Sequence, residues 1–172
     1  MDRVRFRNAD KEDQEFLWQA LFFAVSVPPG TPPPKPEIVK LPELARYVDN
    51  WMRHPGDLGY IATFNGRCIG AAWIRIWSES DSGYGYVNST IPEISISFLP
   101  EYRGKGIGTR LLELLLDKVS KKYEAVSLSV ANYNPAKRLY ERYGFQILGE
   151  IQNDSYTMIK WFGNANTSRT NQ

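Results

Sequence analysis

One stretch constrains the fold of this chain more than any other, because an alternating segment, a glycine-rich loop and a leucine-rich segment follow one another directly. Residues 93–99 (EISISFL) alternate serine with isoleucine and phenylalanine, which predicts a half-buried β-strand. Residues 108–122 carry leucines and a valine at helical spacing and predict an amphipathic helix. A further strand, residues 125–130 (AVSLSV), follows. The order predicts a parallel strand-helix-strand step.

The remaining segments surround that step with further strands and helices. The Asn65-Gly66 pair joins two β-rich runs and predicts a hairpin with a type I′ turn. Six prolines between Val27 and Glu37 predict an irregular loop inside the domain. Helices are expected at residues 9–25, capped by Asp10, at 42–52 and at 134–145, and strands at 4–7, 60–64, 67–77, 145–151 and 155–162. We therefore expect one α/β domain with a mixed sheet over residues 1–163, followed by a polar tail at 164–172.

Composition excludes several classes of protein. A net charge of +2 is too small for the broad positive field of a nucleic-acid-binding protein. One cysteine, Cys68, and one histidine, His54, exclude an internal disulfide and a cysteine-based zinc cluster. The charged N-terminus lacks the apolar centre of a signal peptide, and its longest apolar run, ALFFAV, is far below the ~18 residues of a membrane span. We expect a cytoplasmic protein without metal, membrane or nucleic acid, and leave the oligomeric state open, with a homodimer as one option.

The glycine-rich loop has the chemistry of an anion site. Gly104, Gly106 and Gly108 allow the backbone to approach a ligand, and Arg103 and Lys105 add positive charge. The unpaired N–H groups of the following helix's first turn would point into the same concavity. The spacing fits neither a P-loop nor a dinucleotide-binding fingerprint. A turn that only joins a strand to a helix is the alternative, and the loop alone leaves both interpretations open.

Two motifs in this order resemble the GNAT superfamily of N-acetyltransferases. The first is the Arg/Gln-x-x-Gly-x-Gly/Ala pattern between a strand and a helix, and Arg103, Gly106 and Gly108 fill it. The second follows the next strand and is matched by Asn134, Ala136, Leu139, Tyr140, Gly144 and Phe145. The start of the chain (RFRNADKEDQEFL) is also similar to the first strand and helix of that superfamily. The resemblance is weakest over residues 28–57.

The resemblance implies a GNAT fold with acetyl-CoA as cosubstrate and no metal. The strands at 93–99 and 125–130 would splay, and the pantetheine arm would lie between them. Backbone amides of Phe98 or Leu99 would bind that arm and polarise the thioester carbonyl. The remaining coenzyme contacts implied are Arg103, Gly104, Lys105, Gly106, Ile107, Gly108 and Thr109 at the diphosphate, and Asn134, Lys137 and Tyr140 along the arm.

Acyl transfer to an amine needs a base for the ammonium and an acid for the departing thiolate. The resemblance implies that Tyr140 is the acid, although a packed aromatic on a helix would look the same in the sequence. Glu93 is our candidate for the base, and the alternative interpretation is that it only caps or solvates the end of a strand. Some family members place a glutamate on the next strand, but here Ser129 stands there. A substrate that arrives deprotonated would need no base.

The acceptor site is the part that the resemblance describes least. Trp18, Trp77, Tyr84 and Tyr86 are candidates for an aromatic wall that would suit a cationic or aromatic amine, and core packing is the alternative interpretation for most of them. The predicted function is transfer of acetyl from acetyl-CoA to a primary amine of a small molecule or protein by direct attack. The alternatives are a catalytically silent CoA-binding sensor or partner module, and transfer of a different acyl group.

Overall fold

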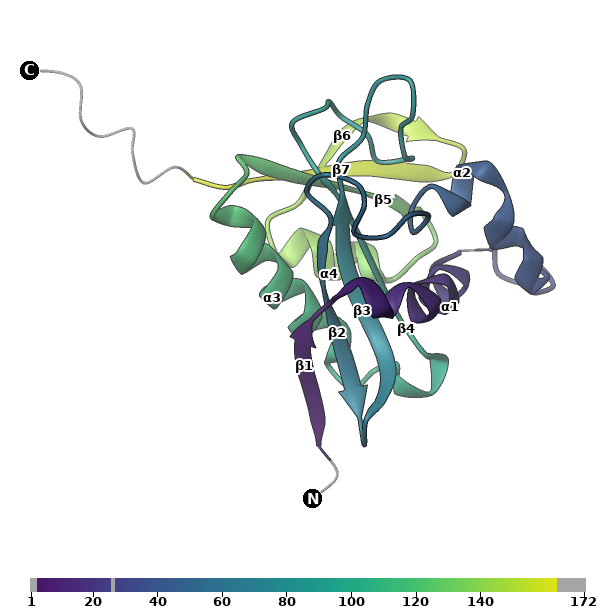
Figure 1. Cartoon of the computed structure of the whole chain (residues 1–172). Helices are drawn as coiled ribbons and strands as arrows, with labels where there is room; N and C mark the ends of the chain where they lie inside the picture. Colours follow the sequence, from purple (N-terminus) through teal and green to yellow (C-terminus); the bar gives the residue numbers. More distant parts are fainter. Residues whose placement is uncertain (1–2, 26, 164–172) are drawn as a thin grey trace, which may run out of the picture.

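The computed structural model describes residues 3–25 and 27–163, and the predicted tail at 164–172 lies outside them. The elements follow the predicted order (Figure 1). They are β1 (Val4–Asn8), α1 (Gln14–Ala24), α2 (Pro42–Ala45), β2 (Leu58–Phe64), β3 (Arg67–Arg75), β4 (Glu93–Phe98), α3 (Ile107–Ser120), β5 (Ala125–Ala131), α4 (Ala136–Arg142), β6 (Gln146–Gln152) and β7 (Ser155–Trp161). Short 3-10 helices lie at Lys11–Asp13, Pro36–Lys40 and Pro100–Tyr102. None of the helices described is both long and apolar enough to cross a bilayer.

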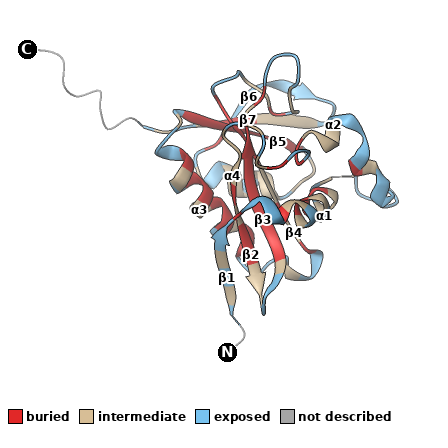
Figure 2. Ribbon diagram, in the orientation of Figure 1, coloured by how far each residue is buried: buried red, intermediate tan, exposed pale blue. Residues whose placement is uncertain are grey.

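A seven-stranded mixed sheet runs through the molecule in the order β1-β2-β3-β4-β5-β7-β6. The pairing of β4 with β5 is parallel, as the strand-helix-strand pattern predicted, and the other pairings are antiparallel. The sheet has helices on both faces (Figure 1). The buried residues concentrate on the central strands and on the inner side of α3 (Figure 2).

Two hydrophobic cores lie on the two faces of the sheet. On one face, the predicted leucine stripe of α3 is buried against the strands, with Leu111, Leu112 and Leu115 fully covered. On the other face, α1 packs with the segment that follows α2, through residues that include Leu17, Val48 and Trp51. The side chains of a strand alternate between faces, so β2 and β3 contribute to both cores.

Two local predictions are confirmed in detail. Asn65 and Gly66 have φ angles of 50° and 78°, as a type I′ hairpin turn requires. Asp10 accepts a hydrogen bond from the Glu12 N–H at 2.8 Å, and the Asp13 carboxylate accepts one from the Asp10 N–H at 2.8 Å. This capping box starts the 3-10 turn that leads into α1.

The helix predicted over residues 42–52 is wrong beyond Ala45, where α2 ends. Side chains of β3 take the backbone carbonyls that a longer helix would use. Arg75 donates to the carbonyls of Arg46 and Asp49, both at 2.7 Å. The Trp73 indole donates to the carbonyl of Tyr47 at 2.9 Å. The segment therefore continues as turns, and tertiary hydrogen bonds override its helical pattern.

Arg75 also forms a fully buried ion pair with Asp57, with an Nη2–Oδ2 distance of 2.8 Å. Removing one partner would leave the other charge buried and uncompensated. We expect Asp57→Ala to lower the free energy of unfolding by about 3 kcal/mol, measured by urea denaturation. The control is Asp117→Ala, which breaks an exposed pair with Lys121 and should cost at most about 0.5 kcal/mol. Equal losses in the two variants would contradict this prediction.

Candidate active site

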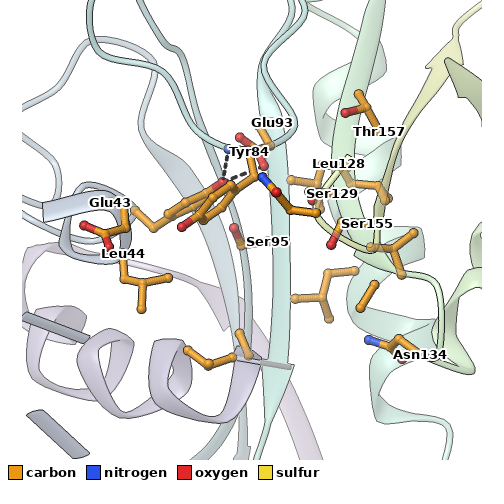
Figure 3. Close-up of a pocket in the computed structure, with 18 of the residues that line it drawn as sticks. Glu43, Leu44, Tyr84, Glu93, Ser95, Leu128, Ser129, Asn134, Ser155 and Thr157 are labelled. Carbon is orange, nitrogen blue, oxygen red and sulfur yellow. Dashed lines mark hydrogen bonds between the residues drawn. The ribbon is translucent and has the colours of Figure 1, made fainter. Parts of the chain in front are cut away.

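The two central parallel strands separate almost where they begin. Within the described chain, which includes both strands whole, β4 and β5 share one register pair, Glu93 with Ser127. The Ser127 N–H donates to the Pro92 carbonyl at 3.0 Å just before that pair. Beyond it, β4 continues beside β3 and β5 continues beside β7. A cleft of about 630 Å³ opens where they part (Figure 3).

The free edge of β4 offers backbone donors to that cleft. Successive N–H groups of a strand point to opposite edges. The Leu99 N–H donates to the Ile69 carbonyl of β3 at 2.8 Å, so it is engaged within the sheet. The Phe98 N–H consequently faces the β5 side. Of the two predicted amides, Phe98 therefore remains the candidate donor.

The glycine-rich loop follows β4 by way of the 3-10 helix Pro100–Tyr102, and it lies outside the residues that line the cleft. Gly104 and Gly106 have φ angles of 72° and 78°, a backbone conformation that favours glycine. Gly106 caps α3 without a side-chain hydrogen bond, and the first turn of α3 carries no acidic residue. Arg103 and Lys105 are exposed beside it. The unpaired N–H groups of this turn can donate to phosphate oxygens, and the two cationic side chains beside it favour negative charge, so the loop suits a diphosphate.

The end of α3 nearest the loop is packed closely on β4. Ile107 and Gly108 are buried and Thr109 is half-buried, whereas residues 103–106 of the loop before them are exposed. A Cβ at Gly108 would lie 2.8 Å from the Phe98 ring. The predicted contacts at Gly108 and Ile107 would therefore come from their backbone.

The second motif contributes two residues to the cleft from the β5 side. Asn134 lies at its wall (Figure 3), and its side-chain oxygen accepts from the Ala136 N–H at 2.9 Å, which leaves its amide nitrogen for a ligand. Tyr140 on α4 also lines the cleft and packs edge-on against Phe145. Burial raises the pKa of Tyr140 to about 12, so its hydroxyl keeps its proton at neutral pH. Lys137 pairs instead with Glu141 at 2.6 Å.

Glu93 stands where β4 and β5 part, and its carboxylate is almost wholly buried, with 3% exposure. Three donors reach it: the Tyr47 hydroxyl at 2.8 Å, the Trp77 indole N–H at 2.7 Å and the Gly85 backbone N–H at 2.9 Å. Burial raises the pKa of Glu93 to about 7, and the three hydrogen bonds oppose that rise. A group with this pKa can gain and lose a proton near neutral pH.

Tyr47 is the site residue that the sequence analysis missed. It lies in the turn region after α2, lines the cleft and is 7% exposed. Its hydroxyl oxygen also accepts from the Tyr84 N–H at 2.7 Å, and the two tyrosine rings are stacked with centroids 6.3 Å apart. Burial and the Glu93 carboxylate raise the pKa of Tyr47. In the sequence, an aromatic residue in a helical pattern carried no signal of this role.

The four predicted wall aromatics separate into one that lines the cleft and three that do not. Tyr84 lines it and is 56% exposed (Figure 3). Trp77 is buried behind Glu93 as a hydrogen-bond donor. Trp18 is half-buried, with the Lys40 ammonium 3.7 Å from its ring centroid. Tyr86 packs against the core on the α1 face. Trp18, Trp77 and Tyr86 therefore do not line the cleft, because each packs against neighbouring segments.

Two unlike walls face each other across the cleft. The wall from α1, the 3-10 helix Pro36–Lys40 and α2 is largely apolar, with Leu21, Ile38, Leu41 and Leu44. The wall from β4, β5 and β7 presents hydroxyl groups, and Figure 3 shows Ser95, Ser129, Ser155 and Thr157 there. Glu43 and Glu150 are exposed and also line the cleft. Among the residues that the structure describes, no three His, Cys, Asp or Glu side chains gather as a metal site.

Comparison with known proteins connects this geometry to one family. The model of the Acetyltransferase (GNAT) family matches residues 27–145. The spermine/spermidine N(1)-acetyltransferase of Bacillus subtilis (strain 168) is 38% identical over 63 residues, which are 34% of this chain and 41% of that protein. This chain therefore matches about two fifths of the length of that relative.

Solved structures share the fold at low sequence identity. The PaiA N-acetyltransferase of Thermoplasma acidophilum, in complex with coenzyme A, has a TM-score of 0.61 at 19% identity, covering 93% of this chain and 99% of that one. The ribosomal-protein-S18-alanine N-acetyltransferase of Escherichia coli has a TM-score of 0.63 at 17% identity, covering 95% and 98%. The acceptors named for these relatives differ, so the shared fold does not identify an acceptor. Since the family model matches well over half of the sequence, this chain belongs to the GNAT family of acetyltransferases.

Proposed function

We propose that the protein is an N-acetyltransferase that moves acetyl from acetyl-CoA to a primary amine. The observation that carries the proposal is the cleft between β4 and β5, which brings a buried carboxyl group, Glu93, and a protonated phenol, Tyr140, to one cavity. In the proposal the pantetheine arm runs along the free edge of β4, with the Phe98 N–H as donor. The N–H groups at Gly106 and the first turn of α3 hold the diphosphate.

The two titratable groups meet the two proton requirements of the reaction. Glu93 accepts a proton from the ammonium, directly or through a water, and the neutral amine then attacks the thioester carbonyl. The carbon–sulfur bond breaks as the amide forms, and the leaving thiolate takes a proton from Tyr140. The Phe98 N–H stabilises the oxygen on which negative charge develops. The amine's second proton is released to solvent or restores Tyr140.

Direct attack without an acyl-enzyme agrees with the position of the chain's one cysteine. Cys68 is at the start of β3, where the Arg7 guanidinium lies 3.8 Å from its sulfur, and it does not line the cleft. Burial raises the pKa of its thiol, which makes the thiolate scarcer at neutral pH. A single unpaired cysteine also suits a reducing compartment, so a cytoplasmic location goes with the proposal.

A small cationic amine is the acceptor that the cleft suits best. Glu43 and Glu150 place two exposed carboxylates at its lining, and Glu93 adds a third, buried carboxyl group. The apolar wall beside Glu43 would cover methylene groups between amines. The relative from Bacillus subtilis is named for spermine and spermidine, which have this chemistry. We propose a polyamine-like acceptor and test it with spermidine against an alkyl monoamine of equal length, which lacks the additional charges; equal kcat/KM for the two would contradict the proposal.

The alternative is a silent CoA-binding module. Ser129 lines the cleft where a second carboxylate would otherwise stand, but Glu93 already supplies one. Coenzyme thiol release with a panel of amines separates the two functions. If the protein binds acetyl-CoA but releases no thiol with any amine, the silent module is correct.

The first prediction of this mechanism concerns Tyr140. Tyr140→Phe removes the proton donor but keeps the ring that packs on Phe145. We expect kcat to fall about 100-fold, as is typical for loss of a general acid, with the acetyl-CoA Kd unchanged. Thiol release and calorimetry measure the two quantities. Tyr60→Phe, on β2 beneath Lys118, is the control and should keep wild-type turnover. Full activity of Tyr140→Phe would remove Tyr140 from the mechanism.

The second prediction concerns pH. Glu93 must be deprotonated to act as a base, so its pKa of about 7 predicts that kcat/KM for the amine falls as the pH drops below about 7. Glu93→Gln cannot accept the proton and should lower turnover while it removes that acidic limb. The measurement is a pH-rate profile from about pH 5.5 to 9.5 at saturating acetyl-CoA. If the acidic limb of the pH-rate profile persists unchanged in Glu93→Gln, another group is responsible for that limb.

The third prediction concerns the diphosphate loop. Gly106→Ala forces a residue with a Cβ into a φ of 78°, which should distort the loop and weaken CoA binding at least about tenfold. Gly30→Ala is a matched control, because Gly30 has a φ of 82° and, like Gly106, has no atom within 4 Å of the place that a Cβ would take. Both variants should lose similar stability, but only the first should weaken binding in calorimetry. If Gly106→Ala and Gly30→Ala bind CoA with equal affinity, the diphosphate does not bind at this loop.

A further inference from the structure

Glu93 is held by groups that no part of the proposed mechanism uses. We infer that Tyr47, Trp77 and the backbone at Gly85 form a donor cage that keeps the buried Glu93 carboxylate ionised and aimed at the cleft, with Tyr47 as its principal positioning residue. The inference rests on the proposed function, in which Glu93 is the base. It adds three groups that determine the pH range in which that base works.

All three members of the donor cage present hydrogens to Glu93. The Tyr47 hydroxyl and the Gly85 N–H reach Oε1, and the Trp77 indole N–H reaches Oε2. An indole N–H and a backbone N–H can only donate. They stabilise the carboxylate and offer no acceptor to a protonated carboxyl group. Without them, a carboxyl group this deeply buried would stay protonated to a much higher pH.

The orientation of the Tyr47 hydroxyl is fixed by a second partner. Its oxygen accepts a hydrogen bond from the Tyr84 N–H at 2.7 Å, in addition to its contact with Glu93. The hydroxyl hydrogen is then free to point toward Glu93 Oε1 at 2.8 Å. Loop residue Tyr84 therefore orients the donor, and the donor stabilises the base.

The loop that carries Tyr84 is fitted closely around the carboxylate. A Cβ at Gly83 or Gly85 would collide with Glu93 oxygens, so only glycine allows this approach. The Ser127 hydroxyl donates to the Gly85 carbonyl at 2.6 Å and fastens the loop to β5. The loop is thus attached at the place where β4 and β5 have their one register pair.

Tyr47 is anchored from the opposite side by β3. The Trp73 indole donates to the Tyr47 carbonyl at 2.9 Å, and Arg75 donates to the preceding carbonyl, that of Arg46, at 2.7 Å. These contacts end the helix before Tyr47 and direct its side chain toward Glu93. The same hydrogen bonds that shorten α2 therefore place the donor.

Other charged groups near the donor cage are already paired or stand at the cleft surface. Arg75 faces Glu93 in register on β3, but its guanidinium is engaged by Asp57. Arg46 lies 3.5 Å from Asp81 and donates to the Ser82 carbonyl. The other titratable residues that line the cleft are Glu43, Tyr84, Tyr133, Tyr140 and Glu150. The three hydrogen bonds of the donor cage are therefore the main interactions that favour ionised Glu93.

The test follows Glu93 directly. Protein labelled with 13Cδ-glutamate is titrated by NMR, and Glu93→Gln identifies the resonance. Tyr47→Phe keeps the ring and removes one donor, so the Glu93 midpoint should rise by about one pH unit. The acidic limb of kcat/KM should move up by the same amount, and turnover should recover toward the wild-type rate at alkaline pH. The KM for acetyl-CoA should not change, because Tyr47 is not among the groups that hold the coenzyme in the proposed function.

Tyr143→Phe is the matched control. The Tyr143 hydroxyl also donates to a glutamate, Glu113, at 2.6 Å, but neither residue lines the cleft. It should leave the Glu93 titration and the pH profile unchanged. Trp77→Phe removes a different donor and should move the midpoint in the same direction as Tyr47→Phe, which keeps the test valid if one variant folds poorly.

The possible failures are distinguishable. If the Glu93 resonance titrates at the same pH in the wild type, Tyr47→Phe and Trp77→Phe, the donor cage has no role and the inference is wrong. A uniform loss of rate at every pH, with an unmoved midpoint, would likewise show that Tyr47 is only structural. If the midpoint moves as expected but no amine supports thiol release in the wild type, the donor cage stands and the proposed function fails.

Discussion

The separation of β4 from β5 after the Glu93–Ser127 pair is the constraint on which the rest of the structure depends. A parallel strand that lost its partner would normally leave unpaired backbone groups in the middle of a sheet. Here β3 and β7 pair fully with the outer edges, and the inner edges are left to face the cleft. The sheet therefore provides a row of backbone donors at the same point where it buries a carboxylate. An extended ligand that fills the gap would complete the pairing.

The parts of this arrangement that local chemistry determines were predictable from the sequence. Asn65-Gly66 specified its turn, Asp10 specified the start of the first helical segment, and the leucines of α3 specified its buried face, because each signal acts within a few residues. The strand-loop-helix pattern predicted the parallel step between β4 and β5. The resemblance then indicated the strands that would part, which periodicity alone could not have shown.

The parts that depend on contacts between distant segments were not predictable in this way. The end of α2 is determined by Arg75, about thirty positions along the chain from the carbonyls that it binds. Trp77 had the pattern of a wall residue and lies behind Glu93, since its indole N–H finds a partner there. Tyr47 lies in a segment with a helical pattern, and the sequence did not distinguish it from an aromatic residue of the core. In each case a polar atom of a buried side chain decided the structure, and hydrophobic periodicity does not report where such an atom finds its partner.

Burial and hydrogen bonding have opposite effects on Glu93, and the site depends on their balance. Desolvation alone would favour the protonated form, which cannot accept a proton from an amine, while full solvation would give a weak base with a pKa near that of a free glutamate. The three groups around Glu93 all donate hydrogen bonds to its carboxylate. They therefore favour the ionised form and leave the pKa of Glu93 at about 7. Each donor comes from a different segment: the turn after α2, the residues after β3 and the loop at Gly85. The protonation of Glu93 is thus coupled to the packing of three segments, so a ligand that displaces the loop at Tyr84 would also change the pKa of Glu93.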